Sequence, residues 1–528
     1  MLQQADTVGV FQVESRAQMA TLPRLKPRCF YDLVVEVAII RPGPIVGDMV
    51  HPYLNRRAGK EPVVPLHPSL EPVLARTLGV PLFQEQLLRM AMVAAGFTGG
   101  QAEELRRAMG FKRSEKRMKQ IEVQLRDGME KNGITGGTAD RIIQSITSFA
   151  LYGFPESHAA SFALLAYASG YLKVHYPAAF YTALLNNQPM GFYHPATLVK
   201  DAQRRGVRFH PIDVQQSDWL CRVDDDGAIR IGFMYVNGLR KDVGQAMAAF
   251  DRTKTMAPPV LCAKCGCDDE SMIEVVRDTR ADRTYYCNIC SNEWTVLLRP
   301  VGRFTSIEDV VQRTGLRRDE LTTLADIGAL NAFTNERRSA LWQVERAVRP
   351  AGELFQGSNH GDAHTEHTEN IEGLRDLRGE SPWLNGSPLR PMDEHERLQA
   401  DYAGMGLTIG PHPLALRRNE LALRGVMRAM DLPQARDGRR VRVAGMVITR
   451  QRPGTAKGFV FLTLEDETGI SNIIVRPDLF DRQRDTVIRQ PFLIVDGVLQ
   501  HQEGVLSIRA ERVEGMNGGA SVDAHDFY

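Results

Sequence analysis

Two closely spaced cysteine pairs lie near the middle of the chain. Cys262 and Cys265 form one Cys-x-x-Cys pair, and Cys287 and Cys290 form a second after 21 intervening residues. Two such pairs can present four thiolates in a tetrahedral array, which is the ligand set of a structural zinc ribbon. We therefore expect these four cysteines to bind Zn²⁺, with Cys267 as a spare or alternate ligand.

A redox or uncoordinated cluster is the alternative for these cysteines. In a cytoplasmic protein, crowded cysteines favour a metal over disulfides. Four sulfur ligands leave no open coordination position, which disfavours a zinc-dependent enzyme. The intervening SMIEVVRDTRADRTYY predicts a β-hairpin of the ribbon. The polar stretch that contains His360, His364 and His367 indicates a loop rather than a metal site.

The densest positive run of the chain is LRRAMGFKRSEKRMKQ. Arginine and lysine side chains of this kind bind phosphate oxygens, so the run could hold a triphosphate, a nucleic-acid backbone, or both. A solvated helix face is the alternative. Phosphate binding is favoured because Gly110 separates the basic clusters and FALYGFPESHAASFAL follows downstream. The basic residues are Arg106, Arg107, Lys112, Arg113, Lys116, Arg117 and Lys119.

The downstream motif combines an aromatic turn with a helix start. Tyr152, Gly153 and Phe154 form the turn, and Ser157 and His158 follow it. Aromatic faces can stack on a base or sugar, and a helix N-terminus favours phosphate. A buried aromatic pair beside a turn is the alternative. The carboxylates of Asp224–Asp226, in contrast, indicate a β-hairpin turn because they lie between two alternating segments.

The elements that must position these residues are mostly helical up to about residue 200. Pro81 to Met109 predicts two helices with a joint at Gly96 and Gly99, and further helices are expected over 138–149 and 158–175. Later segments predict a hairpin over 218–233 and helical stretches over 239–250 and 306–327. The segment 352–391, which is polar and rich in Gly and Pro, predicts a flexible linker.

The last part of the chain has strong strand character. Five short strands with Gly-containing turns predict a small OB-fold barrel over about 438–514. Basic residues gather near one end of it, so we expect a single-stranded template to bind there. Phe459 and Phe461 alternate along one strand, and one of them could stack on a base. The basic residues are Arg439, Arg440, Arg442, Arg450, Arg452 and Lys457.

Length and composition set the frame for these motifs. The chain has 528 residues, enough for three or four domains, and its 43% apolar and 24% charged residues are ordinary for a soluble globular protein. It has no apolar run of about 18 residues, which is what a membrane helix needs. The opening MLQQADTVGVFQ lacks the features of a signal peptide, so we expect a cytoplasmic protein without a membrane partner.

Long strings of the sequence resemble the bacterial family C DNA polymerases, the DNA polymerase III alpha subunits. They include GVFQVESRAQM, AIIRPGPI, LHPSLEPVLARTLGVPLFQEQLLRMA, ELRRAMGFKR and YGFPESHAASFALLAYASGYLKVHYPAAF. Within that family, SPLRPMDEHERLQADYAGMGLTIGPHPLALRR and RQRPGTAKGFVFLTLEDETGISNIIVRPDLF are similar to the error-prone (ImuC-type) branch, which works in damage-induced mutagenesis.

The resemblance implies roles for the motifs described above. Arg106 and Arg107 are expected to face the phosphates of the incoming nucleotide. The turn and helix start are expected near its sugar and base, at Tyr152, Gly153, Phe154 and His158. Further phosphate or DNA contacts are expected at Arg41, Lys112, Arg113, Arg442, Arg450 and Lys457.

The resemblance also implies a domain order. Residues 1–225 correspond to polymerase fingers, 226–348 to a helix-hairpin-helix region with a zinc-ribbon insert at about 256–300, and 349–392 to a linker. A connecting segment (393–437), the OB-fold (438–514) and a flexible tail (515–528) follow. The turns VNGLRKD and DIGAL are of the kind whose backbone amides hold a DNA phosphate. The ribbon insert departs from the family pattern, and it could add a DNA or partner contact or be inert.

Family members carry a PHP domain and a palm ahead of these regions. The palm holds three aspartates that bind Mg²⁺ for nucleotidyl transfer, and no such motif occurs in this sequence. We therefore expect an N-terminally truncated error-prone DNA polymerase that binds DNA and dNTP, reaches the sliding clamp through accessory mutagenesis proteins, and is inactive alone. The alternative is a non-catalytic module, derived from the polymerase, that binds DNA or a partner.

Overall fold

The computed structural model describes residues 1–40, 46–109, 115–149, 154–251, 255–256, 260–279, 282–297, 299–300, 302–348, 387–502, 504–516 and 525–527. The chain forms two compact units. The first comprises Met1–Arg205, Arg417–Asn517 and Asp523–Tyr528, and the second comprises Gly206–Leu416 and Gly518–Val522.

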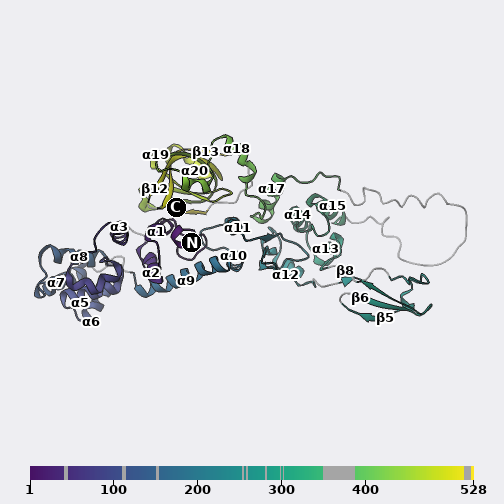
Figure 1. The fold of residues 1–528 in the computed structure, drawn as a ribbon, viewed down its shortest axis with the longest axis horizontal. Coiled ribbons are helices and arrows are strands. Elements are labelled where there is room, and N and C mark those ends of the chain that lie inside the picture. The colour runs from purple at the N-terminus through teal and green to yellow at the C-terminus, as the bar shows by residue number, and fades with distance from the viewer. Residues whose placement is uncertain are drawn as a thin grey trace. The chain divides into compact units, whose positions relative to one another are not determined.

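The first unit begins with a helical part that runs to residue 205 (Figure 1). Its α-helices are α1 Arg16–Leu25, α2 Phe30–Ile39, α3 Val46–Arg57, α4 Glu71–Leu74, α5 Gln84–Ala95, α6 Gly99–Met109, α7 Glu115–Lys131, α8 Gly136–Phe149, α9 Glu156–His175, α10 Pro177–Asn186 and α11 Pro195–Arg204. Short 3-10 turns lie at η1 Leu2–Gln4, η2 Pro68–Leu70 and η3 Ala75–Thr77.

Helices α5 to α8 pack around one apolar core. The predicted joint between α5 and α6 is confirmed: Gly96 ends α5 in the left-handed region at φ 69°, where glycine has no steric penalty. Leu105 on α6 and Leu125 on α7 lie in the same buried cluster as Met90 and Ile142. The exposed end of α6 is therefore carried by a rigid four-helix support.

Helix α9 places small residues on its buried face at alternating spacings of four and three. Ala159, Ala163, Ala166 and Gly170 are buried, and the part of this face with Ala159 and Ala163 packs against α2. Small side chains allow the two helix backbones to approach closely. The predicted helix over 158–175 is thus confirmed, with its first turn beginning at Glu156.

Three buried charged and polar groups tie α9, α10 and α11 together. The Lys173 Nζ lies 2.8 Å from Asp201 Oδ2, and it also donates to the backbone carbonyl of Val8 at 2.6 Å. The Tyr181 hydroxyl donates to the same carboxylate at 2.5 Å. Burial alone would raise the pKa of Asp201, but Lys173 and Tyr181 outweigh that effect and hold the pKa below its usual value.

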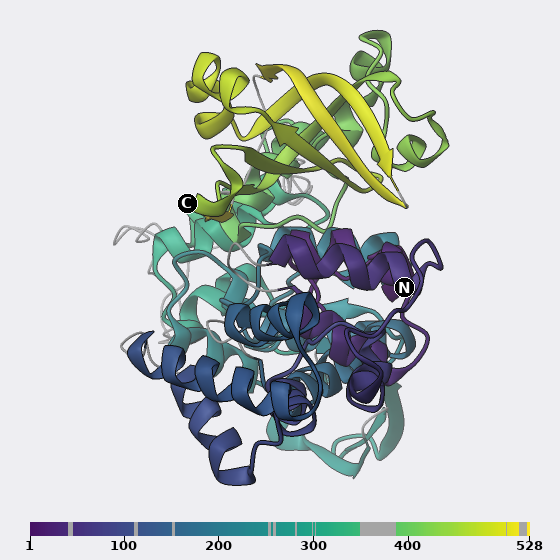
Figure 2. The ribbon, with the colours of Figure 1, turned by 90° about the vertical axis from the view of Figure 1, so that its left-hand side faces the viewer.

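The first unit also contains the C-terminal barrel, and Figure 2 shows α1 beside it. Its strands are β9 Arg440–Gln451, β10 Val460–Glu465, β11 Ile470–Val475, β12 Phe492–Gln502 and β13 Val505–Gly515, with a sixth short strand, β14 His525–Phe527. Helices α18 Arg418–Leu423, α19 Pro477–Arg482 and α20 Arg484–Arg489 accompany them, with 3-10 turns η9 Ala429–Gln434 and η10 Gly454–Ala456.

The strand order β10-β11-β13-β12-β9 closes because β9 also pairs with β10. Alternate residues of β10 and β11 point into the barrel: Leu462 and Ile473 are fully buried, while Phe461 and Ile474 on the other face are half-buried. The five-stranded barrel predicted from the sequence is confirmed.

The second unit contains short strands and helices. Its helices are α12 Lys241–Ala249, α13 Ile307–Thr314, α14 Arg318–Asp326, α15 Arg337–Val348 and α17 Glu394–Met405, with 3-10 turns η4 Phe233–Tyr235, η5 Glu270–Met272 and η8 Ala415–Arg417. Its strands are β1 Phe209–His210, β2 Arg222–Val223, β3 Ile229–Arg230, β4 Thr255–Met256, β5 Ile273–Asp278, β6 Asp282–Cys287, β7 Asn292–Leu297 and β8 Arg299–Pro300.

Most local predictions in this unit are confirmed, with one difference. β2 and β3 form the expected antiparallel hairpin. The single helical stretch expected over 306–327 is instead two helices, α13 and α14, because Gly315 takes φ 62° at the end of α13. The linker expected over 349–392 lies mostly outside the described residues. Among the described residues, no helix is both long and apolar enough to cross a membrane.

The buried Lys173–Asp201 pair provides a test of the first unit's stability. We expect Asp201→Ala to lower the free energy of unfolding by about 3–5 kcal/mol, because it leaves a buried lysine without its carboxylate. Urea unfolding followed by circular dichroism measures the change, and hydrogen exchange assigns it to α9–α11. The control is Asp140→Ala, whose partner Arg126 is solvent-exposed, with an expected loss below about 1 kcal/mol. Equal losses in the two variants would contradict the expectation.

Candidate nucleic-acid interface and metal centre

The last turn of α6 presents two exposed arginines that share one carboxylate. The Arg106 Nη2 lies 2.7 Å from Glu103 Oε1 and its Nε 2.8 Å from Glu103 Oε2, which is a bidentate pair. The Arg107 Nε reaches the same Oε1 at 3.2 Å. The two side chains are 50% and 69% exposed. Both guanidinium groups are thus held on one side of α6, where an anionic ligand can reach them.

The start of α9 is fixed to α5 and α2. The Glu156 backbone amide donates to Glu85 Oε2 at 2.9 Å, and the Tyr31 hydroxyl donates to Glu156 Oε1 at 2.8 Å. Beyond this anchor, the rings of Phe154 and His158 have centroids 5.2 Å apart. His158 is exposed, so an aromatic and an imidazole ring lie together at a helix start, as the motif predicts.

Five of the predicted contacts lie outside the described residues: Arg41, Lys112, Arg113, Tyr152 and Gly153. Their expected roles stay predictions. The histidines His360, His364 and His367 also lie outside the described residues.

The two cysteine pairs come together at one end of the sheet β5-β6-β7. The Sγ atoms of Cys262 and Cys290 are 3.6 Å apart, those of Cys265 and Cys287 are 3.7 Å apart, and all four lie within 4.8 Å of one another. A tetrahedral zinc with bonds of about 2.3 Å separates its sulfurs by about 3.8 Å. The cluster is therefore compatible with a structural zinc.

The sheet that carries this cluster matches the expected ribbon. β5 and β6 form the predicted antiparallel hairpin, and β7 adds a third strand. The rings of Tyr285 on β6 and Trp294 on β7 stack with centroids 5.6 Å apart. Cys267 is half-buried and is not part of the four-sulfur cluster.

The three consecutive aspartates form the predicted hairpin turn. The Asp224 backbone amide donates to the Ala228 carbonyl at 2.8 Å, which closes the turn. The carboxylate of Asp224 is paired with Arg230 at 2.7 Å, and that of Asp226 lies 3.1 Å from His210 Nε2. These contacts give the aspartates a structural role.

Two glycine turns of the second unit, within VNGLRKD and DIGAL, have positive φ. Gly238 has φ 80° and Gly328 has φ 83°. Beside the first turn, Arg240 forms a bidentate pair with the buried Glu320, with both distances at 2.9 Å. Arg240 lowers the pKa of Glu320 to about 2. This pair joins the start of α12 to α14. Binding of DNA phosphate by these turns stays a prediction.

The basic residues of the barrel differ in what their side chains contact. Arg450 is buried, and it donates to the carbonyls of Val487 and Gln490 at 2.8 Å each. Our proposal for DNA binding therefore does not include Arg450. Arg442 is paired with Asp496 at 2.6 Å. Lys457 is exposed on the turn between β9 and β10.

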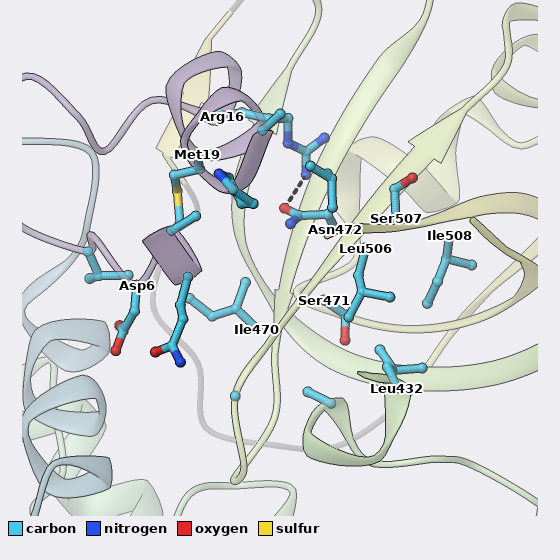
Figure 3. A pocket seen from close by; sticks show the side chains of 18 of the residues that line it. Asp6, Arg16, Met19, Leu432, Ile470, Ser471, Asn472, Leu506, Ser507 and Ile508 are labelled. Carbon is cyan, nitrogen blue, oxygen red and sulfur yellow. Dashed lines mark hydrogen bonds between the residues drawn. The ribbon is translucent and has the colours of Figure 1, made fainter. Parts of the chain in front are cut away.

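A cavity of about 750 Å³ lies within the first unit, between the barrel strands and the α1 segment (Figure 3). Its barrel side includes Ile470, Asn472 and Ile508, and its other side includes Arg16 and Met19. The guanidinium of Arg16 donates hydrogen bonds to four oxygens of β10 and β11. Burial lowers the pKa of Arg16 to about 10. Sequence reasoning did not find this site because its partners are more than 440 residues apart.

A second contact joins α11 to the barrel. The Arg204 Nη2 lies 2.8 Å from Oε1 of Glu465, which is fully buried at the end of β10. The other oxygen, Oε2, has no hydrogen-bond partner among the described residues. Burial raises the pKa of Glu465 to about 7, although Arg204 acts against it.

The raised pKa of Glu465 predicts a pH dependence of folding. An unfolded glutamate has a pKa of about 4.3, so the stability that this residue contributes is present below that pH and is lost as pH rises toward about 7. We expect the wild-type chain to lose about 3 kcal/mol relative to Glu465→Gln over this range. Urea unfolding of both proteins at each pH measures the difference.

The control for this experiment is Glu511→Gln, which changes an exposed carboxylate of β13. Its stability relative to wild type should vary little over the same pH range. A constant difference between wild type and Glu465→Gln would show instead that Arg204 compensates the burial of the carboxylate.

The cysteine cluster predicts a measurable metal content. Freshly reduced protein should contain about one zinc per chain, as expected for a four-thiolate site. Cys287→Ser should lose most of this zinc, because a three-thiolate site binds the metal less tightly. Cys267→Ser is the matched control and should retain it. Elemental analysis after gel filtration measures the zinc content per chain. Reduced protein that contains no zinc would rule out the metal ribbon.

Comparison with known proteins agrees with the arrangement of these sites. The model of the bacterial DNA polymerase III alpha subunit finger domain matches residues 1–133, and that of an OB-fold nucleic acid binding domain matches residues 441–514. Among solved structures, an asparaginyl-tRNA synthetase from Pyrococcus horikoshii is 27% identical over 17% of this chain and 22% of its own, with a TM-score of 0.15, which is too low to indicate a shared fold.

Curated relatives match the chain over its whole length. The error-prone DNA polymerase of Dechloromonas aromatica (strain RCB) is 43% identical over 100% of this chain and 45% of the relative. That of Alkalilimnicola ehrlichii is 43% identical with the same coverage. The order of finger domain and barrel fits this similarity. Over its whole length the chain is similar to error-prone DNA polymerases, and it spans less than half the length of the relatives that it matches.

Proposed function

We propose that this chain is the part of an error-prone DNA polymerase that binds the incoming dNTP and the primer-template DNA during damage-induced mutagenesis and translesion synthesis. The observation that carries the proposal is the exposed pair Arg106 and Arg107 at the end of α6, a helix that packs into one apolar core with α5, α7 and α8. A preorganised pair of guanidinium forks suits the oxygens of a triphosphate.

Glu103 acts in this proposal as a temporary partner of both arginines. It orients the two guanidinium groups while no nucleotide is bound, through the contacts of 2.7–3.2 Å. A triphosphate carries more negative charge than one carboxylate, so it can replace Glu103 as the partner of the forks. The ring of His158, beside Phe154, then offers a surface for the sugar or base.

The chemistry of nucleotide addition requires groups from outside this chain. Two Mg²⁺ ions, when bound, activate the primer hydroxyl and stabilise the leaving pyrophosphate. We propose that their carboxylate ligands belong to the part of the family that this chain does not match. The clustered aspartates Asp224 and Asp226 are poor candidates because they are ion-paired within a hairpin turn.

We further propose that the cysteine cluster holds a structural zinc, that Arg442 and Lys457 contact DNA, and that accessory mutagenesis proteins connect the assembly to the sliding clamp. The proposed compartment is the cytoplasm. The alternative function is a non-catalytic module that binds DNA or a partner.

Primer extension separates the two functions. The purified chain with Mg²⁺ should not extend a primer under either proposal. Joined to the PHP and palm regions of a relative, it should extend one if it is a polymerase part and should not if it is a binding module. Extension by the chain alone would overturn our placement of the catalytic carboxylates.

The proposed contact with the nucleotide predicts the effect of removing the guanidinium groups of Arg106 and Arg107. In the joined enzyme, Arg106→Ala with Arg107→Ala should raise the apparent KM for dNTP by about tenfold or more, since each charge-assisted hydrogen bond contributes about 1.5–3 kcal/mol. Steady-state primer extension measures it. Arg126→Ala, which removes another exposed and ion-paired arginine on α7, is the control and should leave KM unchanged. An unchanged KM in the double variant would exclude the triphosphate contact.

A further inference from the structure

Strands β10 and β11 are the second and third strands of the barrel, and this face is the one by which OB-folds bind oligonucleotides. Two cross-strand pairs form the outer surface here: Phe461 lies opposite Ile474, and Thr463 lies opposite Asn472. An aromatic ring, an amide and a hydroxyl on one flat face are suited to stack on a base and to hydrogen-bond its edge. All four side chains are half-buried rather than exposed.

The cover over this face is the start of α1. The Nη2 of Arg16 donates to the Leu462 carbonyl at 2.5 Å, to Thr463 Oγ1 at 3.2 Å and to Asn472 Oδ1 at 3.1 Å. Its Nη1 donates to the Ile473 carbonyl at 3.2 Å. The guanidinium also lies over the ring of Phe461, 5.3 Å from its centroid. One side chain therefore occupies the aromatic ring, the amide and the hydroxyl at once, as Figure 3 shows for Arg16 and Asn472.

The contact of Arg16 with the barrel is specific, but desolvation of the guanidinium costs free energy. Among the described residues, no carboxylate forms an ion pair with Arg16, so its half-buried charge is balanced by neutral oxygens alone. Removing a charge from water without a counter-ion costs free energy, and this cost offsets part of the stabilisation from its hydrogen bonds. When α1 leaves, the guanidinium regains its hydration, which lowers the cost of opening. A contact of this kind can cover a surface and still be displaced by a ligand.

The cavity beside Arg16 shows that α1 covers the barrel incompletely. Its volume of about 750 Å³ lies within the range of about 300–1,000 Å³ that ligand pockets occupy. Ala17, Met19 and Pro23 of α1 line one side, and Ile470 and Ser507 line the barrel side. A nucleotide could enter this space next to the strand face before α1 is fully displaced.

We propose that α1 is an autoinhibitory cover: Arg16 occupies the strand face of the barrel around Phe461 and Asn472, and single-stranded DNA binds that face only after displacing it. The proposal rests on the proposed function, in that the barrel binds DNA at all, and it adds which face binds and what closes it.

The sign of one substitution separates this role from an ordinary DNA contact. Removing a cation from a DNA-binding surface weakens binding, because fewer counter-ions are released. Removing a cation that competes with DNA strengthens binding instead. With a labelled oligothymidylate of about 16 nucleotides, the upper site size of an OB-fold, Arg16→Ala in the full chain should bind about tenfold more tightly by fluorescence anisotropy.

Two further variants complete the test. Arg28→Ala removes an exposed arginine just after the same helix and should bind no more tightly than wild type. Adding Phe461→Ala to Arg16→Ala should cancel the gain, because the uncovered face loses its stacking ring. Weaker or unchanged binding by Arg16→Ala would overturn the cover. If neither wild type nor any variant binds the oligonucleotide, DNA binding by the barrel, and with it the proposed function, fails instead.

Hydrogen exchange of the unmodified chain gives a readout that does not depend on a variant folding correctly. Addition of the oligothymidylate should increase amide exchange in α1 and protect the amides of β10 and β11. Protection of both α1 and these strands would mean that DNA binds with the cover in place, and the proposal would be wrong.

Discussion

The first unit depends on one physical constraint: a charge taken out of water must find partners. Asp201 meets it with Lys173 and Tyr181, whose contacts measure 2.8 and 2.5 Å. Glu465 meets it less completely, with Arg204 on only one of its oxygens. These pairs hold α9, α10 and α11 in register and bring the barrel against α11. The cover over the barrel is built on this frame, whereas the exposed arginines of α6 rest on the apolar core of α5 to α8.

Local signals in the sequence were sufficient for several elements. Gly96 marked the joint between α5 and α6, and the alternating runs gave the barrel strands. The spacing of the cysteines fixed the four-sulfur cluster because two short knuckles leave little freedom in how the pairs meet. The break at Gly315 was also present in the sequence, but our prediction ran a single helical stretch across it.

Contacts between distant segments could not be predicted in this way. The partners of Arg16 lie on strands more than 440 residues later, and no periodicity connects them. Arg450 illustrates the same limit from the other side, because its position in a basic cluster suggested phosphate binding while its guanidinium bonds carbonyls near α20. The number of charges in a segment says little about which of them remain accessible after folding.

The folding stability of the ribbon of β5, β6 and β7 has a different source from that of the helical parts of the molecule. Its sheet is small, and four thiolates gather at one end of it. Where metal binding and folding are coupled, the free energy of folding includes the chemical potential of the free metal. The persistence of this one segment is then set by zinc supply in the cell, while the packed helices beside it are indifferent to that supply.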